Sequence, residues 1–257
     1  METLEEKVKK FAGWVAESER PVMFTGAGIS TESGIPDFRG PQGVWKTTQP
    51  IMFNDFVGSI DARREYWRRH VKGHGTMANA EPNQGHIAVA DLFAMKPEAH
   101  LITQNVDGLH EAAGVDPQMI TEIHGNATYA KCLNCGARYE LADIRAKFQE
   151  DDEPPTCNSC GGIVKTATIS FGQAMPEDGM RKSEEVTVKC DLFIAIGSSL
   201  VVYPAAGFPE LAKRLGAKLV IINREPTDMD PVADMVLHTE IGPTLTQTMR
   251  LVKGEVS

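Results

Sequence analysis

Short apolar runs recur along the chain, separated by stretches whose apolar residues follow a helical period. The runs are continuous rather than alternating, as in parallel strands covered on both faces of a sheet. We expect such strands at residues 21–25, 100–103, 119–123, 191–197 and 218–223. A further strand is expected at residues 167–173, where the chain returns from an insertion.

Helices are predicted between these strands. Residues 3–18 place Leu4, Val8, Phe11 and Val15 on one helical face. Further helices are expected around residues 61–71, over 84–95 behind Asn83 as N-cap, and over 204–215. Strand and helix in this order predict an α/β fold with a Rossmann-like, doubly wound parallel sheet.

Two segments interrupt the alternation of strand and helix. Residues 41–80 are rich in Trp, Phe, Arg and His without a strand pattern, and residues 126–166 contain four cysteines. We expect a helical module and a zinc-binding module, which together form a smaller lobe. The large domain then takes about residues 1–40, 81–125 and 167–257. A ligand is expected between the lobes, beyond the carboxyl ends of the strands.

The cysteines are spaced like metal ligands. The paired Cys-x-x-Cys spacing of Cys132-x-x-Cys135 and Cys157-x-x-Cys160 predicts a tetrahedral thiolate zinc site, although the 21 residues between the pairs are one more than in the usual zinc ribbon. A redox pair or a coincidence is the alternative. Four thiolates leave no open coordination position, so the predicted zinc is structural. Cys190 precedes a strand and is expected to be a core thiol.

Composition narrows the class of protein. Apolar residues make up 42% of the chain and charged residues 24%, as in ordinary globular proteins. The net charge of −9 argues against a nucleic-acid binder and suits basic partners such as lysine-bearing segments. No secretory leader or membrane-length apolar run is found, so we expect a cytoplasmic protein without membrane contact, monomeric by default.

The strand at 21–25 opens into Gly26-Ala27-Gly28 and then a long polar segment. Glycines directly after a strand allow close approach of backbone to phosphate, which indicates a nucleotide site. Thr31 stands where the dinucleotide fingerprint has its third glycine, and Gly34–Arg39 is too broken for the usual helix. On the glycines alone, a simple tight turn stays possible.

The whole stretch GAGIS…SGIPDFR resembles the cofactor loop of the sirtuins, the NAD-dependent protein lysine deacylases. The resemblance extends from about residue 10 to 242 through TQNVDGLHEAAG, EIHG, the four cysteines, FGQAMP, GSSLVVYPAA and INREPTD. It implies a NAD co-substrate and a structural Zn²⁺. It also implies cofactor contacts from Gly26, Ala27, Gly28, Thr31, Asp37, Phe38, Arg39, Gln104, Asn105, Val106, Asp107, Gly197, Ser198, Ser199, Asn223 and Arg224.

The resemblance also implies the chemistry. His124 would be the catalytic base, acting on a ribose hydroxyl, with Asn105 and Asp107 as further catalytic residues. The products would be free lysine, nicotinamide and O-acyl-ADP-ribose. Taken singly, His124 could be structural and Asp107 an Asx-turn residue. His86 is expected to pack between the lobes and His110 to support the TQNVD loop.

Acyl-lysine protein or peptide substrates are the implied partners, bound as a strand between two edges. These edges correspond to Phe171-Gly172-Gln173 and to Val201-Val202-Tyr203. The chain departs from the family pattern at Gln173, where glutamate is common, at Lys165-Thr166, where Arg-Pro is more frequent, and at Ser198, where threonine is common.

Acyl choice depends on Tyr66 and Arg69, which fit the Tyr-x-x-Arg pattern of family members that remove acidic acyl groups. Arg69 could read an acyl carboxylate, or the basic run could be a solvated helix face. Two other functions stay open: protein mono-ADP-ribosyltransferase, and a catalytically silent module that senses NAD or ADP-ribose.

Overall fold

Six parallel strands form the central sheet of the larger lobe. The computed structural model describes residues 2–255 and orders the strands β3-β2-β1-β7-β8-β9. The order runs outward in both directions from β1 and β7, as in the Rossmann fold. The strands are β1 Pro21–Thr25, β2 His100–Thr103, β3 Ile120–Glu122, β7 Leu192–Ile196, β8 Lys218–Ile222 and β9 Met235–Leu237. The predicted doubly wound α/β class is therefore confirmed.

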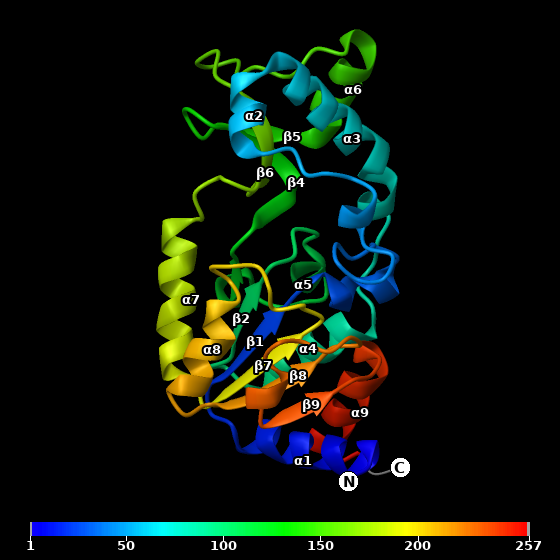
Figure 1. Ribbon diagram of the computed structural model, residues 1–257, viewed down its shortest axis with the longest axis vertical. Helices are drawn as coiled ribbons and strands as arrows, with labels where there is room; N and C mark the ends of the chain where they lie inside the picture. The colour runs from blue at the N-terminus through cyan, green and yellow to red at the C-terminus, as the bar shows by residue number, and fades with distance from the viewer. Residues whose placement is uncertain (1, 256–257) are drawn as a thin grey trace.

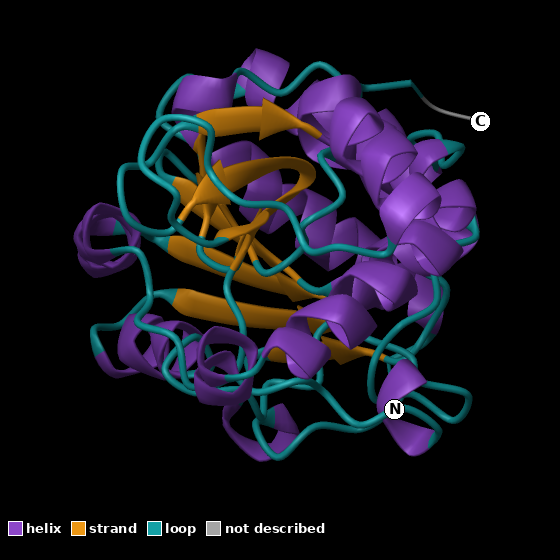
Figure 2. Cartoon of the chain, turned by 90° about the horizontal axis from the view of Figure 1, so that it is seen from above, coloured by secondary structure: helices purple, strands orange, loops and turns teal. Residues whose placement is uncertain are grey.

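Helices cover both faces of this sheet (Figures 1 and 2). Alternate strand residues point to opposite layers: Met23 and Ile194 pack into one core cluster, and Phe24 and Phe193 into another. The first cluster lies under α1 (Leu4–Glu17), α4 (Gln84–Met95) and α9 (Ile241–Val252). The second lies under α7 (Glu177–Lys189) and α8 (Gly207–Arg214). Burial on both faces explains why the strands read as continuous apolar runs.

A three-stranded antiparallel sheet, β5-β4-β6, forms the smaller lobe at the top of Figure 1. Its strands are β4 Gly125–Cys132, β5 Arg138–Glu140 and β6 Val164–Thr168. With it lie α2 (Phe53–Gly58), α3 (Ile60–Ala78) and α6 (Leu141–Asp151). Trp67 of α3 is fully buried among Leu141, Phe148 and Val164, so the helical insertion and the cysteine-bearing segment share one core.

Short elements complete the chain. They are α5 (Leu109–Ala112) and the 3-10 helices η1 (Ala27–Ser33), η2 (Val44–Lys46), η3 (Pro117–Met119) and η4 (Asp230–Val232). Within residues 2–255, no helix is both long and apolar enough to cross a membrane.

The strand expected at residues 167–173 is wrong. β6 ends at Thr168 and belongs to the small-lobe sheet, not to the central one. Beyond it Ile169 donates its N–H to the carbonyl of His124, and Gln173 and Ser170 bond to each other in a turn. Because these backbone groups have local partners, the segment cannot continue a strand ladder.

The helix expected around residues 61–71 is longer than predicted, since α3 spans Ile60–Ala78. Its basic residues meet the acidic end of α6: Arg64 pairs with Glu153, and Arg68 with Asp152. Exposed pairs of this kind contribute little individually, but here both join the two insertions that make the small lobe.

The four cysteines of the zinc prediction lie together at one end of the small-lobe sheet. Their sulfur atoms all lie within 4.8 Å of one another, and the Cys132–Cys160 and Cys135–Cys157 sulfur pairs are 3.6 Å apart. Four thiolates at this spacing suit a tetrahedral Zn²⁺ with Zn–S bonds of about 2.3 Å. Cys132 and Cys157 also belong to the small-lobe core, so the metal would connect the knuckles to that core.

Removing the metal should unfold the small lobe, because structural zinc contributes folding free energy directly. We expect chelation or Cys135→Ser to lower bound zinc from about one per chain and to abolish slow amide exchange in β4–β6. Slow exchange should persist in β1, β2, β7 and β8. Hydrogen-exchange mass spectrometry with metal analysis measures both effects.

Cys190→Ser is the matched control, because Cys190 packs beside the second core cluster, away from the four-cysteine group. It should keep its zinc and its small-lobe protection. Unchanged exchange in β4–β6 after complete zinc removal would contradict the prediction.

Candidate functional site

A cavity of about 680 Å³ lies where the carboxyl ends of the parallel strands face the small lobe. Parallel α/β sheets bind ligands at this edge, next to the point where the strand order reverses. The residues predicted as cofactor contacts that line it are Gly26, Ala27, Gly28, Asp37, Phe38, Arg39, Gln104, Asn105, Val106, Gly197, Ser198, Ser199, Asn223 and Arg224. Thr31 and Asp107 are absent from the lining residues.

The loops after β1 and β7 are in direct backbone contact. Gly26 donates its N–H to Ile196 O at 2.9 Å, and Gly28 donates to Gly197 O at 2.8 Å. A β-carbon on Gly28 would lie 2.7 Å from the Gly197 α-carbon. Gly197 itself has φ +62°, a conformation that glycine adopts without strain. Glycine is thus required here for contact between two loops as well as for a ligand.

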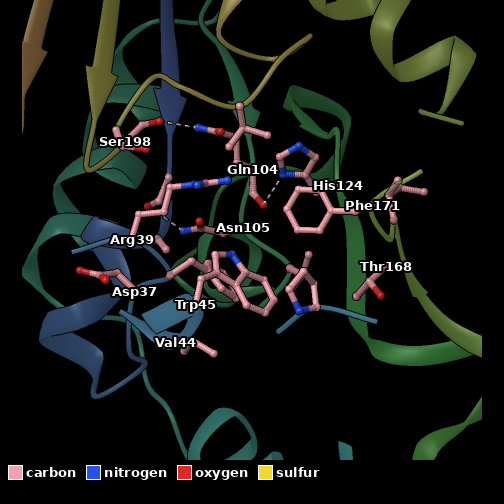
Figure 3. A pocket seen from close by; sticks show the side chains of 18 of the residues that line it. Asp37, Arg39, Val44, Trp45, Gln104, Asn105, His124, Thr168, Phe171 and Ser198 are labelled. Atoms are coloured by element: carbon pink, nitrogen blue, oxygen red, sulfur yellow. Dashed lines mark hydrogen bonds between the residues drawn. The ribbon is translucent and has the colours of Figure 1, made fainter. Parts of the chain in front are cut away.

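Residues 37–45 form a tight loop over one end of the cavity (Figure 3). Asp37 accepts the N–H of Gly40 at 2.8 Å, and Trp45 donates its N–H to the carbonyl of Phe38. The rings of Phe38 and Trp45 stack at 5.0 Å. Because the loop is closed by its own hydrogen bonds, it holds the exposed Arg39 at the cavity.

The end of β2 is connected to the β7 loop through side chains. Gln104 donates from Nε2 to Ser198 Oγ at 2.9 Å, as the dashed line in Figure 3 shows. Asn105 is buried and donates from Nδ2 to Gly26 O and to Ser30 Oγ, both at 3.2 Å. These bonds fix the amides of Gln104 and Asn105 at the cavity wall.

Asp107 lies behind this wall. Its carboxylate accepts from Ser30 Oγ at 2.7 Å and from the N–H of Leu109 at 3.0 Å, so it acts on the wall through Ser30. The second bond is the Asx-type turn that the sequence allowed. Thr31 donates its hydroxyl to Gly28 O at 2.9 Å and supports the glycine loop from behind.

Two buried histidines extend the network further from the cavity. His86 accepts the N–H of Asn83 at Nδ1, so its Nε2–H faces Ser30 Oγ at 3.4 Å. His110 lies 3.0 Å from Thr25 Oγ1 through Nε2, consistent with support of the loop. Burial lowers the pKa of His86 to about 4 and that of His110 to about 3, so both are neutral. The expectation that His86 packs between the lobes is wrong, because these partners all belong to the large lobe.

His124 follows β3 and lines the cavity. Its Nδ1 lies 3.1 Å from the carbonyl oxygen of Gln104, which can only accept. Nδ1 therefore carries the proton, and Nε2 keeps a lone pair. Burial lowers the pKa of His124 and outweighs the raising effect of the Gln104 hydrogen bond. The side chain is a neutral imidazole of defined tautomer, as a general base requires.

The segments predicted to bind substrate meet at the cavity, with one exception. Phe171, Gly172, Gln173, Val202 and Tyr203 line it, whereas Val201 is exposed outside the lining set. Gln173 turns back to accept the N–H of Ser170 at 3.1 Å. Tyr203 is 69% exposed, which leaves a large apolar surface open beside the opening.

Tyr66 and Arg69 also line the cavity, from α3. Arg69 is already paired: it donates to Glu65 at 2.6 Å and to the carbonyl of Gln49 at 2.7 Å. The Tyr66 hydroxyl contacts Thr166 and, at 3.5 Å, Thr168.

At the opposite end, Arg224 pairs with Glu240 at 2.5 Å, and Asn223 donates to Glu225 O at 2.7 Å. Glu225 and Pro226 join Asn223 and Arg224 in the lining.

Sequence reasoning missed several contributors. No role was predicted for Trp45, which follows the glycine-rich segment, and Ser30 was predicted only as part of the GAGIS motif. Thr166 and Thr168 line the wall from β6, where the expected strand was misplaced. An aromatic residue after a glycine-rich loop was the available signal for Trp45; the two threonines gave none.

Comparison with known proteins agrees with this geometry. The family model described as "Sir2 family" matches residues 26–204. An NAD-dependent protein deacetylase of Rhodopseudomonas palustris is 53% identical over 243 residues, 95% of this chain and 96% of the relative. An NAD-dependent protein deacylase 2 of Archaeoglobus fulgidus is 38% identical over 251 residues, covering 97% and 98%.

Solved structures give the same result. A Sir2–p53 peptide–NAD⁺ complex superposes with a TM-score of 0.85 at 35% identity, covering 98% of this chain and all of that one. A Sir2 protein bound to acetylated peptide gives a TM-score of 0.85 at 34% identity with the same coverage. The chain belongs to the Sir2 family, the sirtuins.

Proposed function

We propose that this protein is an NAD-dependent protein lysine deacylase. The observation that carries the proposal is His124, whose fixed tautomer leaves a basic Nε2 in a cavity that also holds a nucleotide-type glycine loop. The relatives named as deacetylases and the structures containing peptide with NAD⁺ support it. The products are free lysine, nicotinamide and O-acyl-ADP-ribose.

The lining residues fit NAD. The glycine loop and Arg39 would hold the diphosphate side, and Ser198, Asn223 and Arg224 the adenosine side. Bound NAD supplies an ADP-ribosyl group that can accept the acyl group, with nicotinamide as leaving group. Around it, the amides of Gln104 and Asn105 present fixed dipoles in a site closed by the 37–45 loop.

Asp107 takes a positioning role in this proposal. Its contact with Ser30 orients the hydroxyl that Asn105 bonds to, so the carboxylate acts one residue away from the cavity wall. His124 takes a proton at Nε2 from the reacting hydroxyl, while the Gln104 carbonyl holds the imidazole in place. Phe171 lies beside His124 in Figure 3 and places an apolar ring next to this step.

The substrate is an acyl-lysine peptide held between residues 170–173 and 201–203, which, apart from Val201, line the cavity. The net charge of −9 suits basic segments around the lysine. We place the protein in the cytoplasm, because its five cysteines, all within residues 2–255, form no disulfide and four of them are grouped as metal ligands. The net charge of −9 argues against nucleic acid as a partner, and we take the monomer as the default state.

Mass spectrometry of one acetyl-lysine peptide, with and without NAD, tests the function. Loss of acetyl that requires NAD and releases nicotinamide supports deacylation. Nicotinamide release with ADP-ribose attached to protein would instead identify a mono-ADP-ribosyltransferase. Tight ADP-ribose binding without nicotinamide release would identify a silent sensor.

His124→Ala should lower kcat/KM for the acetyl peptide by about 10²–10⁴-fold, the usual contribution of a general base. ADP-ribose binding should persist, because glycine and amide groups elsewhere make most of the proposed contacts. Steady-state kinetics and calorimetric titration measure the two effects. Turnover near that of the wild type would contradict the assignment of His124 as the general base.

The pH dependence of kcat/KM should reflect a general base whose pKa is lowered. Burial lowers the pKa of His124 below its ordinary 6.5, and only the neutral imidazole can accept a proton. We therefore expect kcat/KM to be level at neutral pH and to fall on acidification with a midpoint below 6.5. A midpoint at or above this value would contradict the buried environment.

Gly28→Ala should weaken ADP-ribose binding by about tenfold and lower the melting temperature, because overpacking costs about 1–3 kcal/mol. Its β-carbon would press on Gly197 at 2.7 Å. Gly13→Ala is the matched control: nothing lies within 4 Å of that position on α1, so binding should be unaffected. Wild-type affinity in Gly28→Ala would contradict the proposed contact.

A further inference from the structure

Three hydroxyl groups meet on the small-lobe wall of the cavity. Tyr66 comes from α3, and Thr166 and Thr168 come from β6; all three line the cavity. The Tyr66 hydroxyl bonds to Thr166 Oγ1, and Thr166 Oγ1 lies 2.8 Å from Thr168 Oγ1. We call these residues the hydroxyl cluster.

The hydroxyl cluster has one proton more than its own bonds use. Three hydroxyls carry three protons, and the two close contacts use two of them. The remaining pair, Tyr66 and Thr168, is 3.5 Å apart, too long for a good O–H···O bond. One O–H is therefore available to donate to a group that enters the cavity.

A buried cation lies directly behind the hydroxyl cluster. Lys165 is 0% exposed, and its Nζ donates to Thr168 O at 2.7 Å and to Thr168 Oγ1 at 3.3 Å. Its Nζ also lies 5.5 Å from the centre of the Tyr66 ring. Among residues 2–255, no ion pair to Lys165 is found, and burial lowers its pKa to about 7. A buried ammonium without a carboxylate partner is costly.

Lys165 also sets the direction of the hydrogen bonds. In its ammonium form Lys165 can only donate, so Thr168 Oγ1 accepts from it and passes its own proton toward Thr166 or the cavity. Hydrogen bonds in a chain polarise one another. The wall therefore presents a donor backed by positive charge. Arg69, the other cation on this wall, is occupied by Glu65 and the Gln49 carbonyl.

We propose that the hydroxyl cluster and Lys165 form a subsite for the far end of the acyl group and select acyl-lysines that end in a carboxylate. The proposal rests on the proposed deacylase function and deepens it. A carboxylate would accept the spare O–H and offset the charge of Lys165, whereas an apolar end would leave the O–H unsatisfied and that charge without a counter-ion. Arg69 keeps its partners and is not needed for this selection.

The test compares three acyl groups on the lysine of one peptide: acetyl, succinyl and 4-methylpentanoyl. The last two have the same number and arrangement of non-hydrogen atoms, but only succinyl ends in a carboxylate. Acetyl ends in a methyl group and reports basal activity. We expect wild-type kcat/KM for succinyl to exceed that for 4-methylpentanoyl by about tenfold or more, as for a hydrogen bond to a charged group.

Thr168→Val removes one hydroxyl with nearly unchanged shape, and Tyr66→Phe removes another. Each should reduce the succinyl to 4-methylpentanoyl ratio by about tenfold, and Lys165→Met should do the same. Acetyl removal gives the basal rate of each variant, with which its succinyl and 4-methylpentanoyl rates are compared. Thr128→Val and Tyr129→Phe on β4 are matched controls outside the cavity lining, and both should keep the wild-type ratio.

Melting temperatures and acetyl kinetics identify any variant that fails to fold, and Tyr66→Phe and Thr168→Val test the hydroxyls independently. Acetyl removal with no succinyl preference in the wild type would overturn this inference alone. A preference that survives all three cluster variants but is lost in Arg69→Gln would also overturn it. If the wild type removes no acyl group with NAD, the proposed function fails and this inference with it.

Discussion

The contact between the loops after β1 and β7 is the constraint on which the site depends. Gly26 and Gly28 lie against Gly197 with no room for a β-carbon on either side. This contact brings the two halves of the sheet together where the strand order reverses. Gln104 then reaches Ser198, and Asn105 reaches the carbonyl of Gly26. Backbone, not side chains, sets the spacing of the cofactor wall.

Behind that wall several polar groups hydrogen-bond in series. Asn105 bonds to Ser30, Ser30 to Asp107, and His86 approaches the same hydroxyl. Burial keeps His86 and the neighbouring His110 neutral, so Asp107 carries the formal charge of this network. A single carboxylate with fixed partners in a low-dielectric setting orients the wall more firmly than exposed groups could. It does so without touching the cavity.

The sequence was most informative where one physical signal dominates. The apolar runs predicted β1, β2, β7 and β8 almost to the residue, because burial on both faces makes their central positions apolar. β9 and α9 were missed. In α9 the signal was present, because Ile241, Leu245 and Met249 recur at a helical period and pack on α1 and α4.

Within the site, the motifs predicted which residues line the cavity better than they predicted the contacts of individual side chains. Nearly all predicted residues line the cavity, yet Asp107 points behind it and Arg69 is bound by Glu65. The ion pair of Arg69 with Glu65 could be predicted from the sequence, because a glutamate four residues before an arginine favours an ion pair on a helix. The hydroxyl cluster could not be predicted from the sequence, since Tyr66 and Thr166 are separated by 100 residues and meet only through tertiary packing.

The four-cysteine site and the two threonines of the hydroxyl cluster belong to the same small-lobe sheet. On β4 the zinc ligand Cys132 pairs with Val164 of β6, and Ala130 pairs with Thr166. Trp67, next to Tyr66, is buried in the core that contains Cys132. The position of both hydroxyl-bearing elements therefore depends on a core that the four thiolates hold together. A structural metal with no open coordination position can in this way support the distant wall of the cavity, through the strand register and the shared core.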